Sequence, residues 1–153
     1  MKNLNQNFRL VLTDDDTEDC EMFNEALKMV DTNVTLEVLH NGQELLDHLH
    51  ENCSELPNLV FLDLNMPIMD GIETVEAIRN DDKLKHISVV IFSTSSREED
   101  IEQTYCKGAN GFICKPSNFT KLQEIIKKAL EINWNRQRTG NGQLTREQYY
   151  LTF

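Results

Sequence analysis

The segment Leu59-Val60-Phe61-Leu62-Asp63-Leu64-Asn65-Met66-Pro67 decides how this chain folds. Its four consecutive apolar residues predict a strand that is buried on both faces of a sheet. Asp63 follows directly, at the carboxyl end of that strand, which is the edge where open α/β sheets bind ligands. Pro67 ends regular strand pairing, and Gly71 permits a tight turn. The sequence therefore presents one carboxylate on a short loop at the edge of a sheet.

Outward from this strand, apolar strand-like runs alternate five times with segments of helical periodicity. This (βα)5 alternation predicts an α/β fold, a doubly wound parallel sheet with helices on both faces. The flavodoxin-like strand order 2-1-3-4-5 is common at this size, and it makes the first and third strands neighbours. Thr17 is expected to cap the first helix. The expected strands are Phe8–Thr13, Val34–Leu39, Leu59–Asp63, Ser88–Ser93 and Gly111–Cys114, and the expected helices are Glu18–Val30, Gly42–Glu51, Gly71–Arg79, Glu98–Lys107 and one from about Asn118 through Leu130.

The length of 153 residues fits one domain with a core of ordinary size. We expect an N-terminal arm at 1–7, the folded domain at 8–134 and a C-terminal tail at 135–153. An apolar content of 39% and a charged content of 27% are typical of a globular protein rather than a disordered one. The four cysteines have no metal-binding spacing, so reduced and mostly buried thiols are expected.

The net charge of −11, from 26 acidic and 15 basic residues, excludes several kinds of partner. An acidic field disfavours DNA, whose phosphates need basic side chains, and disfavours anionic membrane surfaces. No apolar stretch reaches the roughly 18 residues that a membrane span requires, and the first residues do not form a signal peptide. We therefore expect a cytoplasmic protein that does not bind DNA or membranes.

Three acids, Asp14, Asp15 and Asp16, directly follow the first expected strand. Crowded carboxylates raise one another's pKa, and a hard divalent cation removes that repulsion. Because Mg²⁺ prefers oxygen ligands and retains waters or phosphate oxygens, Asp14, Asp15 and Asp63 predict a Mg²⁺ site between neighbouring strands. The alternative is that these acids only cap the next helix, whose N-terminus attracts negative charge. The convergence with Asp63 favours the metal site.

Two further strand ends carry groups that suit a phosphoryl ligand. The fourth strand ends in Ser93 and Thr94, and the fifth ends in Lys115 before Pro116. A hydroxyl can donate a hydrogen bond to a phosphoryl oxygen, and an ammonium group neutralises its charge. Either group alone is more often ordinary turn chemistry or a solvated lysine. The combination predicts a site for Mg²⁺ and phosphate at the carboxyl edge of the sheet.

The ordered set of motifs resembles the response regulator receiver domains of two-component signalling over about Arg9–Asn133. It consists of Asp14-Asp15, Leu62-Asp63-Leu64-Asn65-Met66-Pro67, Asp70-Gly71, Ser93-Thr94 and Lys115-Pro116. Three further segments are similar to stand-alone regulators of the cyanobacterial-phytochrome type, namely Leu39-His40-Asn41-Gly42-Gln43-Glu44, Arg79-Asn80-Asp81-Asp82-Lys83-Leu84 and Gly108-Ala109-Asn110-Gly111-Phe112-Ile113-Cys114-Lys115-Pro116.

The resemblance implies a role for each matching residue. Asp63 would accept a phosphoryl group from a sensor histidine kinase or a phosphotransfer protein. Asp14, Asp15 and Asp63, with the backbone carbonyl of Asn65, would hold Mg²⁺. Lys115 would bind the phosphoryl oxygens. The switch would consist of Ser93, with Thr94 as the alternative hydroxyl, and of Phe112, which is otherwise an ordinary core aromatic. The chain would then be a phosphoacceptor in a phosphorelay and not an enzyme that acts on other substrates.

Two rival functions and the tail complete the expectations. A haloacid-dehalogenase-like phosphatase needs a second acid two residues after its nucleophile, where this chain has Asn65. A flavodoxin-like binding module needs a phosphate loop that three acids would repel. Because no DNA-binding domain is expected after the fifth helix, output would reach a downstream protein target or a homodimer. The aromatic end, 143–153, is either a frayed terminus or packs on the domain or on a second subunit.

Overall fold

The computed structural model describes residues 7–132, 134 and 145–153. The expected arm at 1–7, except Asn7, and the expected tail from 135 to 144 lie outside the described residues. The strands are β1 Phe8–Thr13, β2 Val34–Leu39, β3 Leu59–Leu62, β4 Val89–Ser93, β5 Gly111–Cys114 and β6 Tyr150–Leu151. The helices are α1 Thr17–Val30, α2 Gly42–Glu51, α3 Gly71–Arg79, α4 Glu98–Lys107, α5 Phe119–Glu131 and α6 Arg146–Tyr149.

The strands form one parallel sheet in the order β2-β1-β3-β4-β5-β6. The predicted flavodoxin-like order of the first five strands is therefore confirmed, and a sixth short strand extends the sheet beyond β5. Thr13 at the end of β1 lies opposite Leu62 at the end of β3. This register brings the loops after β1 and β3 together at the carboxyl edge of the sheet.

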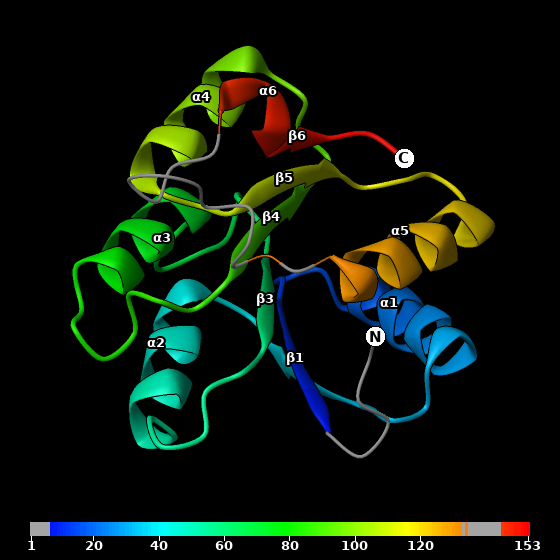
Figure 1. Cartoon of the computed structure of the whole chain (residues 1–153), viewed down its shortest axis with the longest axis horizontal. Helices are drawn as coiled ribbons and strands as arrows, with labels where there is room; N and C mark the ends of the chain where they lie inside the picture. The colour runs from blue at the N-terminus through cyan, green and yellow to red at the C-terminus, as the bar shows by residue number, and fades with distance from the viewer. Residues whose placement is uncertain (1–6, 133, 135–144) are drawn as a thin grey trace.

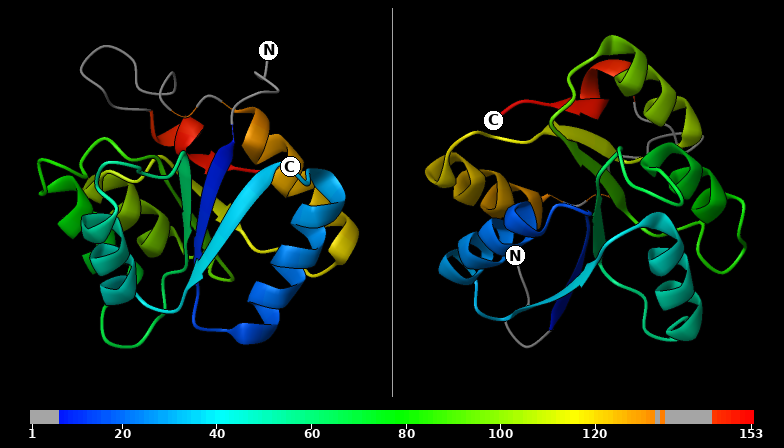
Figure 2. Two further views of the ribbon diagram at one scale, coloured as in Figure 1. Left: turned by 90° about the horizontal axis from the view of Figure 1, so that it is seen from below. Right: turned by 180° about the vertical axis from the view of Figure 1, so that it is seen from behind.

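Two helical layers cover the sheet, with α1 and α5 on one face and α2, α3 and α4 on the other (Figure 1). Each layer buries its own apolar cluster against the strands. Phe23, Phe61 and Phe92 pack together on the α1 and α5 face. On the opposite face, Phe112 and Tyr149 belong to the cluster that includes the apolar residues of α2, α3 and α4. The views in Figure 2 show the same sheet between its layers. No helix among the described residues has the length and apolar character needed to cross a bilayer.

The boundaries of some elements differ from the expectation by one residue. β3 ends at Leu62, so Asp63 begins the following loop, and β4 begins at Val89 rather than Ser88. The predicted cap of α1 was wrong, because the side chain of Asp16, and not that of Thr17, accepts hydrogen bonds from the amides at the helix start. The capping alternative for the three acids is thus correct for Asp16.

Candidate phosphoacceptor site

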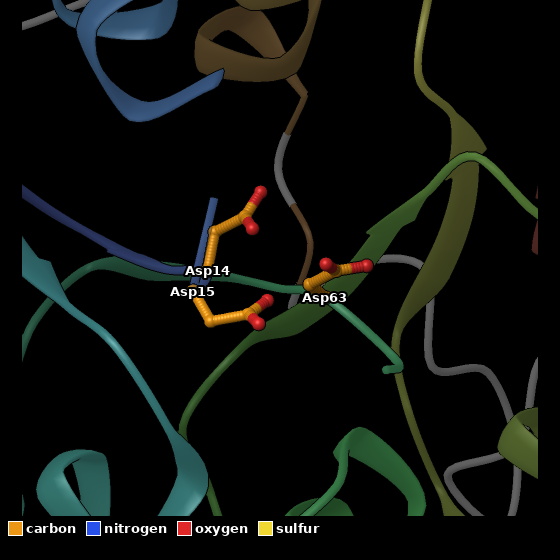
Figure 3. Close-up of side chains that lie close together, drawn as sticks. All are labelled: Asp14, Asp15 and Asp63. Atoms are coloured by element: carbon orange, nitrogen blue, oxygen red, sulfur yellow. The ribbon is translucent and has the colours of Figure 1, made fainter. Parts of the chain in front are cut away.

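The carboxylates of Asp14, Asp15 and Asp63 converge at the carboxyl edge of the sheet (Figure 3). Asp14 and Asp15 lie in the loop after β1, and Asp63 lies in the loop after β3. Each offers one oxygen within 4.8 Å of the others. Asp14 is buried and Asp15 is exposed, so one side of the cluster is open to solvent. Oxygen donors with room for waters fit a hard divalent cation.

Lys115, directly after β5, places its ammonium group among these acids. Its Nζ lies 2.6 Å from Asp14 Oδ2, 3.0 Å from Asp19 Oδ2 and 3.6 Å from Asp63 Oδ2. Its side chain is only 9% exposed. Burial alone would lower the pKa of Lys115, but the hydrogen bond to Asp14 and the charge of Asp63 outweigh burial and raise it. Lys115 is therefore a fixed cation beside Asp63.

Asp63 is held in one orientation, and its surroundings disfavour the ionised form of its carboxyl group. Its Oδ1 accepts a 2.8 Å hydrogen bond from the amide of Leu64, which fixes the plane of the carboxylate. Burial raises the pKa of Asp63 from 3.8 to about 6, and the charge of Asp14 adds to this effect, while Lys115 and the Leu64 amide oppose it. The carboxylate is consequently still ionised for the most part at neutral pH, which a nucleophile requires.

The two candidate hydroxyls differ in position. Ser93, the last residue of β4, is completely buried, and its Oγ accepts a 3.2 Å hydrogen bond from the amide of Ser95. Thr94 is exposed, and it lines a hollow of about 80 Å³ together with Asp19 and Lys115. The main-chain bond from Lys115 N to Ser93 O, 2.8 Å long, joins the ends of β4 and β5. Both hydroxyls thus lie at the same edge as Lys115.

The remaining predicted residues lie farther from the acids or in the loop after β3. Phe112 is fully buried on β5 and contacts Tyr149 and Tyr150 rather than an acidic side chain. Asn65 is exposed in the loop, and its role as a carbonyl ligand stays a prediction. Sequence reasoning missed Asp19, the second acid bonded to Lys115. The available signal was its position in the first turn of the helix, five residues after Asp14.

The loop after β3 contains one strained residue, Ile68. Its φ of 70° is in the left-handed region, which β-branched residues rarely adopt. The amide of Met69 donates a 2.7 Å hydrogen bond to the carbonyl of Pro67, so Ile68 is the central residue of a γ-turn. The Ile68 side chain is 81% exposed. Gly71 completes the loop, because a Cβ there would lie 2.4 Å from the carbonyl oxygen of Asp63. The chain after the acceptor is therefore tightly confined.

The family model for the response regulator receiver domain matches residues 10–127. The chain belongs to the response regulator receiver family. It is 32% identical over 130 residues to the response regulator Rcp1 of Synechocystis sp., covering 82% of this chain and 87% of that protein. The phosphorylated cyanobacterial phytochrome response regulator RcpA has a similar structure, with a TM-score of 0.76, 32% identity and coverage of 82% of this chain and 93% of RcpA.

A second solved structure bears on the acidic cluster. The Mn²⁺-bound form of Rcp1 matches with a TM-score of 0.69 and 30% identity, over 83% of this chain and 94% of that chain. The predicted similarity to phytochrome response regulators is confirmed, and the phosphatase and flavodoxin-like alternatives are not favoured. The three converging carboxylates together with a Mn²⁺-bound relative indicate a divalent cation site in this receiver domain.

Proposed function

We propose that this protein is a response regulator that accepts a phosphoryl group on Asp63 from a sensor histidine kinase or a phosphotransfer protein. The observation that carries the proposal is the convergence of Asp63 with Asp14, Asp15 and Lys115 at one edge of the sheet. That a relative of similar structure is a phosphorylated response regulator supports it. The acceptor would act in the cytoplasm and pass the signal to a downstream protein.

In the proposed reaction, Asp63 attacks the phosphoryl group of a phosphohistidine. A carboxylate oxygen of Asp63 would bond to phosphorus as the phosphorus–nitrogen bond breaks, and the electron pair would leave with the imidazole nitrogen. This transfer needs positioning and charge neutralisation more than covalent help. The Leu64 amide orients the nucleophile, Lys115 offsets negative charge on the phosphoryl oxygens, and the hydroxyl of Ser93 or Thr94 is the candidate donor to one of these oxygens.

Asp14, Asp15, Asp63 and the Asn65 carbonyl would hold the divalent cation, which we propose is Mg²⁺. When bound, such an ion neutralises charge on the phosphoryl oxygens. Without it, the ionised form of Asp63 is disfavoured by burial and by Asp14. The cation would therefore also help to keep the acceptor ionised.

Incubation with acetyl phosphate and Mg²⁺ tests the acceptor. We expect intact mass spectrometry to show one added phosphoryl group on the wild-type protein and none on Asp63→Asn. The matched control is Asp82→Asn, because Asp82 is an exposed acid outside the site, and this variant should label normally. EDTA or Asp15→Ala should abolish labelling. Labelling of Asp63→Asn would refute the acceptor, and normal labelling in EDTA would refute the metal requirement.

A further inference from the structure

The C-terminal residues 145–153 pack on the face formed by α4 and β5 (Figure 1). Thr145 and Gln148 form a capping box at the start of α6. β6 then pairs in parallel with β5, with Tyr150 opposite Phe112 and Leu151 opposite Ile113. The segment is thus attached to β5, the strand that ends directly before Lys115.

Tyr149 anchors the segment between α4 and β5. Its side chain is fully buried, and its hydroxyl donates a 2.6 Å hydrogen bond to Thr104 Oγ1 on α4. Its ring centroid lies 5.3 Å from that of Tyr105 and 6.4 Å from that of Phe112. A buried and hydrogen-bonded tyrosine of this kind fixes the spacing between the helix and the strand.

Arg146 contacts the solvent-exposed side of α4. Its Nη2 donates to Glu98 Oε2 at 2.6 Å, and its Nε donates to Glu102 Oε2 at 2.9 Å. The two acids are one turn apart on α4, so the guanidinium group bridges the first half of the helix. Because these groups are partly exposed, the bridge contributes less than Tyr149 does. The segment therefore contacts α4 both in the core and at the surface.

Four hydrogen bonds, connected through the covalent structure of Ser95 and Asp100, join the end of β4 to Tyr149. Ser93 Oγ accepts from the amide of Ser95 at 3.2 Å, and Ser95 Oγ donates to Asp100 Oδ2 at 2.6 Å. The carbonyl of Asp100 accepts from Thr104 Oγ1 at 2.9 Å, and Thr104 Oγ1 in turn accepts from Tyr149. Four successive contacts thus lead from the end of β4 through the first turns of α4 to the C-terminal segment.

The geometry points to a latch: residues 145–153 hold α4 against β5, and phosphorylation of Asp63 loosens this hold through Ser93, Ser95, Asp100 and Thr104. The inference rests on the proposed function, because the Ser93 hydroxyl must turn toward a phosphoryl group. Since Ser93 is fully buried, moving its Oγ weakens the bond from Ser95 and shifts the start of α4. Thr104 and the acids that bind Arg146 belong to that helix, so the latch loses its alignment.

Hydrogen–deuterium exchange with mass spectrometry tests the latch on the full chain. Loss of one hydrogen bond corresponds to about a fivefold change in an opening equilibrium. We therefore expect amides of 145–153 to exchange about fivefold faster after labelling with acetyl phosphate and Mg²⁺, while those of α1 stay unchanged. If intact mass shows labelling and the exchange of 145–153 does not change, the latch is refuted and the proposed function stands. If no label forms, the proposed function fails instead.

A second arm tests the connection without phosphorylation. Ser95→Ala removes the bond to Asp100, whereas Ser96→Ala alters the neighbouring exposed serine. We expect Ser95→Ala to speed exchange in 145–153 severalfold and Ser96→Ala to have no effect. The single tryptophan gives an independent signal, because Trp134 and Leu151 both lie against Gly111, and its fluorescence should shift as the segment opens. Equal exchange in both serine variants would overturn the connection.

Discussion

The carboxyl edge of the sheet and the C-terminal segment both adjoin β5, but their polar groups lie in very different surroundings. At the edge, Asp63 has a raised pKa, and Ile68 adopts a left-handed conformation. The buried hydroxyl of Thr13 has no hydrogen-bond partner among the described residues. In the C-terminal segment, by contrast, the buried hydroxyl of Tyr149 is hydrogen-bonded, and Arg146 is paired with two acids.

This difference indicates that the carboxyl edge lowers the stability of the fold, whereas the C-terminal segment raises it. Strained or poorly solvated groups persist at functional sites only where the surrounding structure holds them in place. Here the surrounding structure includes the buried strands on both sides of Asp63 and the C-terminal contacts on β5. Substitutions at the edge should therefore stabilise the fold while impairing phosphotransfer, and substitutions in the segment should destabilise it. Four predictions test this contrast, from the largest expected effect to the smallest.

Tyr149→Ala should have the largest effect, because it removes a fully buried aromatic side chain. We expect the free energy of unfolding to fall by about 3–5 kcal/mol, as for other buried aromatic residues replaced by alanine. Urea denaturation measures this change. The matched variant Tyr149→Phe keeps the ring and loses only the bond to Thr104, so it should cost about 1 kcal/mol. A loss below 1 kcal/mol for Tyr149→Ala would show that the segment does not pack on the domain.

Asp63→Asn should stabilise the protein when divalent cations are absent. A raised carboxyl pKa means that the folded state binds more protons than the unfolded state between pH 3.8 and about 6. Protonated Asp63 therefore contributes to the free energy of unfolding at low pH, and this contribution is lost as the pH rises through the folded pKa. At about 1.4 kcal/mol per pKa unit, the variant should be more stable by roughly 3 kcal/mol at pH 7.5.

The pH dependence of the stability gain in Asp63→Asn distinguishes the raised pKa of Asp63 from a general repacking of the site as its cause. The advantage of Asp63→Asn should be about 1.4 kcal/mol smaller at pH 5 than at pH 7.5, because most of the folded wild-type carboxyl is then protonated. Denaturation in EDTA at both pH values gives the comparison. Added Mg²⁺ should stabilise the wild-type protein more than the variant, since Asp63 is a proposed ligand. An advantage that does not change with pH would rule out the raised pKa as its cause.

Thr13→Val should stabilise the fold by a smaller amount. Thr13 is fully buried at the end of β1 and its Oγ1 has no partner among the described residues. An isosteric methyl group removes an unsatisfied hydroxyl, which costs about 1–2 kcal/mol when buried. Thermal or urea denaturation measures the gain. Thr35→Val is the control, because Thr35 is exposed and bonded to Asn7, and it should not gain stability. A loss of stability in Thr13→Val would contradict the unsatisfied state.

Most of the fold could be predicted because local signals agreed with the global pattern. The buried runs of β3 and β4 and the alternation around them were sufficient for the order of five strands. The sixth strand and α6 could not be predicted, because two and four residues are too few to show periodicity. Their stability comes from tertiary contacts of Tyr149 and from pairing with β5. The aromatic content of the tail left open whether it frays or packs, and on which surface it would pack.

The convergence of the site could be predicted from strand ends, but its detailed contacts could not. Parallel strands place Asp14 and Asp63 at one edge whatever their side-chain conformations. Asp19 was missed because its bond to Lys115 depends on where the first turn of α1 lies relative to the residue after β5, which sequence spacing does not specify. Likewise, Asp16 and Thr17 both suit a helix cap in sequence, and only the backbone decides between them. The roles of Ser93, Thr94, Lys115 and Phe112 stay predictions for labelling experiments.

Ile68→Gly should have the smallest effect and isolates the strain at the edge. Glycine relieves a left-handed conformation that costs other residues about 1–2 kcal/mol, although its flexibility in the unfolded state costs about 0.5–1 kcal/mol. Ile68→Ala removes the same exposed side chain but retains a Cβ, so it keeps the strain. We therefore expect Ile68→Gly to be more stable than Ile68→Ala by about 0.5–1 kcal/mol in urea denaturation. Equal stability of the two variants would mean that the loop after Asp63 carries no such strain. The contrast between the carboxyl edge and the C-terminal segment would then rest on the buried polar groups of the edge alone.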